Sequence, residues 1–422
     1  MVLTPESFEL DCGCGKRHDV SIEKIIIEEN TLAGLKQSIA GCGLGGRATA
    51  IYDENTKSAV SDYGLDFDSE VVLSPTGLHA DENATKAVMA RGVAQQSDFL
   101  VAVGSGTVHD ITRWCANEIG IPFISCPTAA SVDGFCSSVS AMTWYGYKKT
   151  MPGIAPALVV ADLNVIAKAP FYLTSSGVGD MVGKYISLAD WRMGNLLTGE
   201  DCCAPIVKLM SDALSSVTNS VSGLALGDFS AYEKLVFGLL LSGVAMQLSG
   251  NSRPASGAEH HISHFIEMGV LGPNTSLHGE KVGVGALLVA SVYQRIAELT
   301  REDAAKRIMD PAGIDKNTIE RVFGRLSTGV LEENKDHCLH GVTAEIILAN
   351  WSQICETVRE IPSVCDIERI LLQAGAKTKL LDVGVSETRL QEILYYSPFV
   401  RNRLTLMRIA SECGLLKSLY DS

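Results

Sequence analysis

The chain has 422 residues, of which 46% are hydrophobic and 20% charged, enough for two or three domains with a large core. The formal net charge of −14 argues against non-specific binding to nucleic acid and against an anionic membrane surface. A small anionic substrate is still compatible with this charge, because a local pocket recognises it.

Cysteine usage and the N-terminus predict a cytoplasmic protein with reduced thiols. The twelve cysteines are scattered, and a chain of this size needs no disulfide framework. The first residues contain neither a basic region nor a long apolar core, so they do not resemble a signal peptide. The apolar run 235–248 is shorter than the ~20 residues of a membrane helix and predicts a buried core helix, so no membrane insertion is expected.

The N-terminal stretch 8–30 alternates like strands around Cys12, Cys14 and His18. These three side chains could form half of a zinc site. The spacing is C-x-C rather than C-x-x-C, and no second pair follows nearby, so the pattern favours a turn. A helix over 31–40 and a buried strand over 47–52 follow. Asp53 ends that strand, where it suits either the hydroxyls of an adenosine ribose or the N-cap of a helix.

A β-α-β unit follows a predicted helix over 81–95. It consists of a strand over 99–103, a loop over 104–106, a helix over 107–117 and a strand over 121–125. Glycines stand where the strand meets the helix N-terminus, at which backbone N–H groups and the helix dipole hold phosphate. His109 occupies the third glycine position of the G-x-G-x-x-G fingerprint, so a plain Rossmann assignment is weak. The position nevertheless favours a phosphate-binding loop over a mere tight turn.

The next turn is dense in hydroxyls and small residues around Asp133, which could orient a substrate hydroxyl or form an Asx-turn. A hairpin over 142–151 and a short strand over 157–161 complete the α/β signals. Strand signals vanish after Pro170. We therefore expect an α/β domain over 1–168 and an all-helical domain over 169–422.

The helical half begins with a helix over 174–189, with Asp180 in its first turn and Lys184 one turn later. Asp180 could be a partner of the helix dipole or a ligand for a metal. Further helices are predicted over 202–222, 230–249, 255–270, 278–299, 316–328, 341–359, 366–374 and 386–395.

Histidines gather in the stretch 257–279. His260 and His264 are four residues apart, so a helix places them on one face and turns His261 aside. A loop of Gly, Pro and Asn then reverses the chain and allows His278 to return beside His260. Two imidazoles and one carboxylate would hold a divalent metal with one coordination position open. A capping or surface role is the alternative, which the density of histidines disfavours.

Together these pieces resemble the superfamily of iron-containing (group III) alcohol dehydrogenases and dehydroquinate synthases, and within it the bacterial branch of the glycerol-1-phosphate dehydrogenase family. The similarity rests on the order of five motifs: GSGTVHD at 104–110, PTAASVDGFCSS at 127–138, GVGDMVGKYISLADW at 177–191, SRPASGAEHHISH at 252–264 and LHGEKVG at 277–283. The resemblance implies an α/β dinucleotide-binding domain followed by an all-α domain, a dehydroquinate synthase-like fold with a metal in the cleft.

The resemblance also implies roles for individual residues. Asp180, His260 and His278 would be the metal ligands and, with His264, the catalytic residues. Substrate would contact Asp133, Asp180 and His264. The dinucleotide would be bound by Asp53 at the ribose, Ser137 beside the nicotinamide, and Gly104, Ser105, Gly106, Thr107, Val108, His109, Asp110, Thr128, Ala129, Ala130 and Ser131. Lys184, Arg253 and Lys281 are candidates for the substrate phosphate, chosen for their charge and position in the sequence.

The activity implied is the reversible reduction of dihydroxyacetone phosphate to sn-glycerol 1-phosphate with NAD or NADP and one divalent metal, nickel or zinc, with iron possible by donor type. A homodimer is implied by the family alone. Three alternatives stay open: a glycerol dehydrogenase acting on an unphosphorylated polyol, a dehydroquinate synthase-like lyase, and a dinucleotide-binding protein without activity. A basic pocket for phosphate would distinguish the phosphorylated substrate from the unphosphorylated polyol of a glycerol dehydrogenase. The Asp–His–His set argues against a binding protein without activity.

Overall fold

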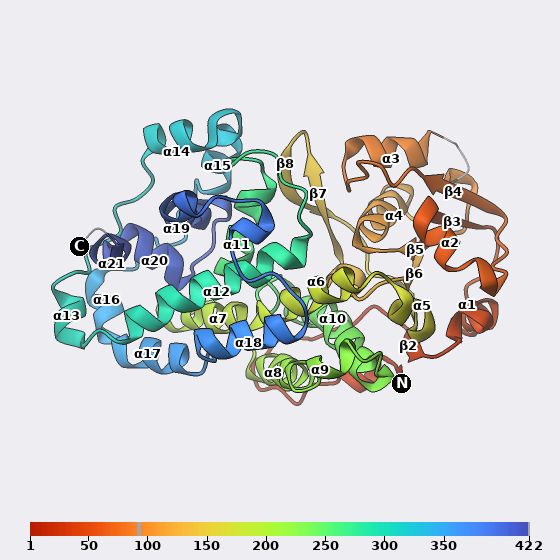
Figure 1. The fold of residues 1–422 in the computed structure, drawn as a ribbon, viewed down its shortest axis with the longest axis horizontal. Helices are drawn as coiled ribbons and strands as arrows, with labels where there is room; N and C mark the ends of the chain where they lie inside the picture. The colour runs from red at the N-terminus through yellow and green to blue at the C-terminus, as the bar shows by residue number, and fades with distance from the viewer. Residues whose placement is uncertain (91–93, 421–422) are drawn as a thin grey trace.

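The computed structural model describes residues 1–90 and 94–420. It has two parts, an α/β part with the sheet at the right of Figure 1 and a helical part at the left. The fold class predicted from the sequence is confirmed. The last sheet strand, β9 (Leu158–Asp162), is followed by α5 (Leu163–Lys168), and the helices of the second part begin with α6 (Phe171–Val182).

A seven-stranded sheet forms the centre of the α/β part, in the order β1-β2-β9-β6-β5-β3-β4. All pairs are parallel except β1 with β2. Every residue of β5 is buried, as expected for a parallel strand covered by helices on both faces. Besides β9, the strands are β1 (Val2–Leu3), β2 (Lys24–Glu28), β3 (Ala48–Asp53), β4 (Ser69–Leu73), β5 (Phe99–Gly104) and β6 (Phe123–Pro127).

A helix follows each of the strands β2, β3, β4 and β5. These helices are α1 (Leu35–Gly41), α2 (Glu54–Ala59), α3 (Glu82–Met89) and α4 (Gly106–Ile119). The predicted β-α-β unit is confirmed as β5-α4-β6. The helix expected over 81–95 ends earlier, at Met89, and residues 91–93 of that prediction lie outside the described residues. The strand alternation expected over 8–30 is limited to β2; residues 9–23 form an irregular segment.

A two-stranded hairpin of β7 (Val139–Trp144) and β8 (Tyr147–Pro152) confirms the predicted turn. Tyr145 and Gly146 both have positive φ, 51° and 80°, which a two-residue type I′ turn requires. The hairpin stands between the two parts in Figure 1. An ion pair of 3.3 Å joins Lys148 on β8 to Glu267 of the helical part, so the hairpin ties both parts together.

The helical part contains most of the predicted helices, several of them divided. Gly183 separates α6 from α7, so Asp180 lies near the end of α6 rather than in a first turn as predicted. The helices after α6 are α7 (Lys184–Thr198), α8 (Ala204–Thr218), α9 (Val221–Leu224), α10 (Phe229–Ser249), α11 (Ala258–Glu267), α12 (His278–Ala297), α13 (Arg301–Ala305), α14 (Lys316–Phe323), α15 (Ser327–Glu333), α16 (Ala344–Ala349), α17 (Trp351–Arg359), α18 (Val364–Gln373), α19 (Leu390–Tyr396), α20 (Leu406–Glu412) and α21 (Leu415–Tyr420).

Glycines allow α6 and α12 to cross with their backbones in contact. A Cβ at Gly279 of α12 would lie 1.9 Å from the carbonyl oxygen of Ser176, and one at Gly179 would lie 2.3 Å from the carbonyl oxygen of Gly279. Neither distance is compatible with a side chain. The crossing brings Asp180, next to Gly179, close to His278, next to Gly279.

Helix α10 packs against α8 on one side and against the segment around Cys136 of the α/β part on another. By length and composition it is long and apolar enough to cross a membrane, but 67% of its most apolar window is buried inside the protein. A Cβ at Gly238 would lie 2.9 Å from Val217 of α8, and one at Gly243 would lie 2.8 Å from the backbone of Cys136. These contacts are those of a core helix, as the sequence predicted.

Candidate active site

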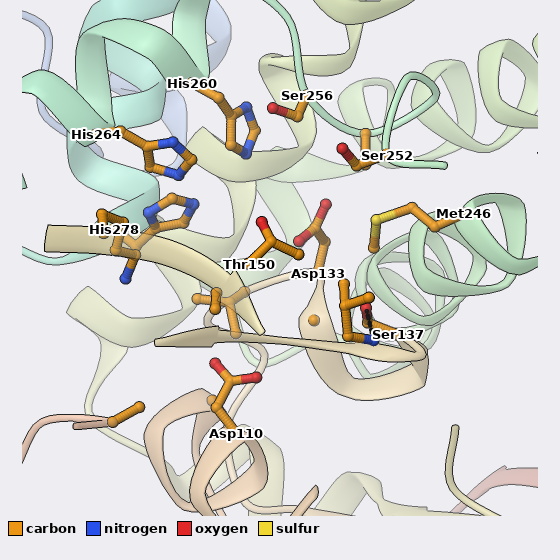
Figure 2. Close-up of a pocket in the computed structure, with 18 of the residues that line it drawn as sticks. Asp110, Asp133, Ser137, Thr150, Met246, Ser252, Ser256, His260, His264 and His278 are labelled. Atoms are coloured by element: carbon orange, nitrogen blue, oxygen red, sulfur yellow. Dashed lines mark hydrogen bonds between the residues drawn. The ribbon is translucent and has the colours of Figure 1, made fainter. Parts of the chain in front are cut away.

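A cleft of about 840 Å³ lies between the sheet and the helical part. Its walls come from the loop after β5, the segment after β6, the hairpin, and helices α10, α11 and α12. This is the crevice at the carboxyl ends of parallel strands, where open α/β sheets bind ligands. Figure 2 shows three imidazole rings at one end of the cleft, with Asp133 and Ser137 directed towards the same space.

The three imidazoles belong to His260, His264 and His278. The ring centroid of His260 lies 6.0 Å from that of His264 and 5.2 Å from that of His278. His260 and His264 both line the cleft from one face of α11, whereas His261 is buried outside it. The helical spacing predicted this arrangement. Burial lowers the pKa of His260 to about 3 and that of His264 well below its usual value, so both rings are neutral at pH 7.

A carboxylate orients each of the two rings nearest Asp180. Nδ1 of His260 is 2.7 Å from Glu259, and Nδ1 of His278 is 2.7 Å from Glu267. The carboxylates accept the Nδ1 protons and leave the lone pair of each Nε2 free to bind a metal, as in metal-ligating histidines. Burial disfavours the charged form of His278, but the Glu267 carboxylate outweighs it and raises the pKa of that ring. Neither glutamate was expected from the sequence.

Asp180 supplies the carboxylate beside these rings. Its Oδ1 is 3.6 Å from Nε2 of His260, and ligand atoms of Asp180, His260 and His278 all lie within 4.8 Å of one another. One carboxylate and two imidazoles are a donor set that suits zinc, nickel or iron(II). The donor types, their mutual distances and the carboxylates behind the rings therefore fit a divalent metal.

Lys184 neutralises the carboxylates at this end of the cleft. It has no exposed side-chain surface, and its Nζ lies 2.6 Å from Asp133, 2.9 Å from Asp180 and 3.0 Å from the carbonyl oxygen of Ala255. Burial opposes ionisation of Asp133, yet the Lys184 ammonium lowers the pKa of that carboxyl to about 2. Asp133 also accepts a hydrogen bond of 2.8 Å from Ser242. Because all these groups are satisfied by one another, Lys184 is a counter-charge behind the cleft wall.

The N-terminus of α4 opens into the cleft. Ser105, Gly106 and Thr107 line it there, and no side chain caps this helix. Its first backbone N–H groups are therefore available to an anionic group, as in dinucleotide sites. Asp110, Ser131 and Ser137 also line the cleft. Of the thirteen residues predicted to contact the dinucleotide, the structure brings these six to the cavity.

The other predicted dinucleotide residues lie outside the cavity lining: Asp53, Gly104, Val108, His109, Thr128, Ala129 and Ala130. His109 packs against Phe135 with ring centroids 4.8 Å apart and bonds the Ser105 carbonyl through Nδ1 at 2.9 Å, so it shapes the loop from behind. Asp53 accepts a hydrogen bond from the Thr56 backbone at 2.9 Å, which makes it the N-cap of α2.

The positively charged residues that line the cleft differ from those that the sequence analysis proposed for the substrate phosphate. Arg253 is buried, forms an ion pair with Glu200 and donates to the carbonyl oxygen of Leu404 at 2.6 Å, so the structure holds it away from the cavity. Lys281 is likewise directed to the Ser276 carbonyl oxygen at 2.6 Å. Three other cations line the cleft, namely Lys148, Arg401 and Arg403.

Arg401 and Arg403 reach the cleft from the segment before α20. Arg401 donates to Thr150 at 3.3 Å, and Arg403 donates to the Ser256 carbonyl oxygen at 2.6 Å and the Ser252 hydroxyl at 2.7 Å. The three acceptor residues are labelled in Figure 2, to the right of the imidazoles. Burial and the like charges of Arg253 and Arg401 lower the pKa of Arg403 to about 10, so an anion bound here would relieve repulsion.

Comparisons with known proteins agree with this geometry. A family model described as iron-containing alcohol dehydrogenase matches residues 26–170. A glycerol-1-phosphate dehydrogenase (NAD(P)+) of Bacillus licheniformis is 32% identical over 97% of this chain and 94% of its own length. A glycerol-1-phosphate dehydrogenase (NAD(P)+) of Thermococcus kodakarensis is 30% identical over 70% of this chain and 86% of its own length.

Among solved structures, an iron-containing alcohol dehydrogenase from Corynebacterium glutamicum superposes with a TM-score of 0.60 over 94% of this chain and 96% of that one. At 16% identity this likeness shows the fold alone. The curated relatives, matched at 30% identity or more over most of their length, show the family. The chain belongs to the glycerol-1-phosphate dehydrogenases within the iron-containing alcohol dehydrogenases.

Proposed function

We propose that this protein catalyses the reversible, NAD(P)H-dependent and metal-dependent reduction of dihydroxyacetone phosphate to sn-glycerol 1-phosphate. Residues 1–168 would hold the dinucleotide, and residues 169–422 the metal and the substrate. The observation that carries the proposal is the Asp180–His260–His278 set at the same cleft as Arg401 and Arg403. The proposal includes a cytoplasmic homodimer, as in the family that the sequence resembles.

Asp180, His260 and His278 would hold one divalent cation, for which nickel and zinc are our first candidates. When bound there, a cation polarises the substrate carbonyl and stabilises the negative charge that develops on its oxygen. Glu259 and Glu267 fix the orientation of the two rings, and Lys184 forms a buried ion pair of 2.9 Å with Asp180. The protein thus supplies a preorganised carboxylate and two oriented imidazole nitrogens.

The N-terminus of α4 would hold the pyrophosphate of the dinucleotide, and Ser137 would lie beside the nicotinamide, from which hydride passes to the carbonyl carbon. His264 faces the same space from one turn beyond His260. Its Nδ1 has no hydrogen-bond partner and its ring is neutral, so it can bond a substrate oxygen and pass a proton. Asp133 would receive a substrate hydroxyl.

The phosphate of the substrate would lie against Arg401 and Arg403, because Lys148, the third cation of the cleft, is paired with Glu267. A guanidinium group can bind two phosphate oxygens at once, and Arg401 and Arg403 contact Thr150 and Ser256, which line the same cleft as the imidazoles. Sequence position alone suggested Arg253 and Lys184, but Arg253 forms an ion pair with Glu200, and Lys184 forms ion pairs with the buried carboxylates of Asp133 and Asp180. The basic cluster favours a phosphorylated ketone over an unphosphorylated polyol.

The test is oxidation of NADH and NADPH with dihydroxyacetone phosphate beside dihydroxyacetone. We expect turnover of the phosphorylated ketone only, and a product that a stereospecific sn-glycerol-3-phosphate dehydrogenase does not oxidise. Preference for dihydroxyacetone would instead support a glycerol dehydrogenase. The ratio of rates with the two dinucleotides establishes whether NAD or NADP is preferred.

A further inference from the structure

A second group of metal-ligand side chains lies outside the cleft lining, next to the C-terminal end of α10. It consists of Cys12, Cys14 and His18 from the irregular N-terminal segment and Cys203, which precedes α8. Ligand atoms of all four lie within 4.8 Å of one another. The N-terminal segment, red in Figure 1, runs beside α8 at the lower edge of the molecule. We propose that these four side chains bind a structural zinc ion.

The distances match a tetrahedral site. Zinc lies about 2.3 Å from a thiolate and about 2.0–2.1 Å from an imidazole nitrogen, so ligand atoms in a tetrahedron are about 3.6–3.8 Å apart. Cys12 and Cys203 sulfurs are 3.3 Å apart, Nε2 of His18 is 3.2 Å from the Cys14 sulfur, and the same Nε2 is 3.5 Å from the Cys203 sulfur. Small movements of these side chains close the site.

His18 is already oriented for coordination. Its Nδ1 lies 2.6 Å from the carbonyl oxygen of Leu248 in α10, which accepts the Nδ1 proton and leaves the lone pair of Nε2 directed at the sulfurs. A backbone carbonyl behind a ligating imidazole is a common outer-shell partner in zinc sites. On binding, zinc displaces the three thiol protons, and His18 enters as a neutral ligand. Three thiolates and one imidazole form a closed tetrahedral set typical of structural zinc.

The site connects distant parts of the chain. The N-terminal segment and the loop before α8 are also joined by an ion pair between Lys16 and Asp201. Immediately after His18, Asp19 and Ser21 line the cleft, and Ser21 bonds Gln247, another lining residue, at 3.0 Å. The zinc ion would therefore hold the segment that closes this side of the cleft. The N-terminal pattern alone predicted a simple turn, because the fourth ligand of the site, Cys203, comes 185 residues after His18.

The experiment is cobalt substitution of the full-length protein, purified under reducing conditions and stripped of metal. A thiolate site gives strong sulfur-to-cobalt charge-transfer absorption in the near ultraviolet, which a site of one carboxylate and two imidazoles cannot produce. We expect this absorption in the wild type and in Asp180→Asn. In Cys14→Ser we expect the band to disappear and the metal content to fall by one equivalent per chain. Cys365→Ser changes another exposed cysteine and is the matched control.

Cys14 is exposed, so Cys14→Ser is the variant most compatible with folding; Cys203→Ser, at a buried position, is the second. The inference would be overturned if the wild type and Cys14→Ser bound the same amount of metal and the wild type showed no charge-transfer band. So would a Cys12–Cys203 disulfide, seen as a mass lower by two hydrogen atoms, that persists in fresh protein under mild reduction. Because the readout is absorption and metal content, it is independent of whether dihydroxyacetone phosphate is the substrate.

Discussion

Replacing Lys184 by methionine separates a counter-charge from a substrate ligand. The Lys184 ammonium lies 2.6 Å from Asp133 and 2.9 Å from Asp180, and none of the three side chains has more than 12% exposure. Methionine keeps the length and apolar volume but leaves two carboxylates without their cation. Removing one partner of a buried ion pair costs about 3–5 kcal/mol of folding free energy.

That cost converts to a measurable change in melting temperature. A chain of 422 residues with an unfolding entropy of about 2.1 cal/mol/K per residue has about 0.9 kcal/mol/K in total. We therefore expect metal-free Lys184→Met to melt about 3–6 °C below the metal-free wild type in a thermal scan with chelator. Lys208→Met is the control: its pair with Asp212 is 75% and 65% exposed and contributes at most about 1 kcal/mol.

Adding metal provides the decisive comparison. A divalent cation at Asp180 restores positive charge beside that carboxylate, so the deficit of Lys184→Met should fall to less than half when zinc or nickel is present. An equal deficit with and without metal would refute the reasoning. A normal melting temperature together with a large rise in KM for dihydroxyacetone phosphate would show that Lys184 binds the substrate phosphate, as its sequence position suggested.

Three further outcomes follow from the contacts. Arg401→Met should lower kcat/KM for dihydroxyacetone phosphate about 10- to 100-fold, from charged hydrogen bonds of about 1.5–3 kcal/mol, whereas Arg253→Met should lower the melting temperature instead; the reverse pattern would return the phosphate to Arg253. Gly279→Ala forces apart α6 and α12 and should lower both stability and metal content, while Gly34→Ala, with open space at its Cβ, should not; an unaltered Gly279→Ala would contradict the crossing. His264→Asn should reduce kcat about 100-fold or more at full metal content by elemental analysis, and concurrent metal loss would make it a ligand.

Local patterns made part of this site predictable. The turn between β5 and α4 is encoded within eight residues, because a buried apolar strand, two glycines and a helix follow one another directly. The four-residue spacing of His260 and His264 fixes a common helix face whatever surrounds it. The short strand predicted over 157–161 is likewise confirmed as β9, with the sequence LVVAD. By contrast, β4, with the sequence SEVVL, was not predicted, because its serine and glutamate conceal an edge strand.

Contacts between distant residues could not be predicted in this way. Arg401 and Arg403 reach the cleft 137 or more residues after His264, from a segment with no motif of its own. Arg253 seemed suitable because it precedes the histidines, but Glu200 pairs with it in the folded chain. Glu267 meets His278 because α11 and α12 pack together, and Glu259 contacts the neighbouring His260 through the orientation of that ring, which residue spacing alone does not fix.

The most direct measurement is the rate of NADH or NADPH oxidation with dihydroxyacetone phosphate before chelation, after it, and after zinc or nickel is restored, in the wild type and in Asp180→Asn. The account predicts that activity is lost with the metal and regained with it in the wild type, and that Asp180→Asn stays at least about 100-fold slower at every step, a barrier increase of about 2.7 kcal/mol. Asp180→Asn with wild-type turnover and wild-type metal content would contradict the assignment of Asp180, His260 and His278 as the catalytic metal site.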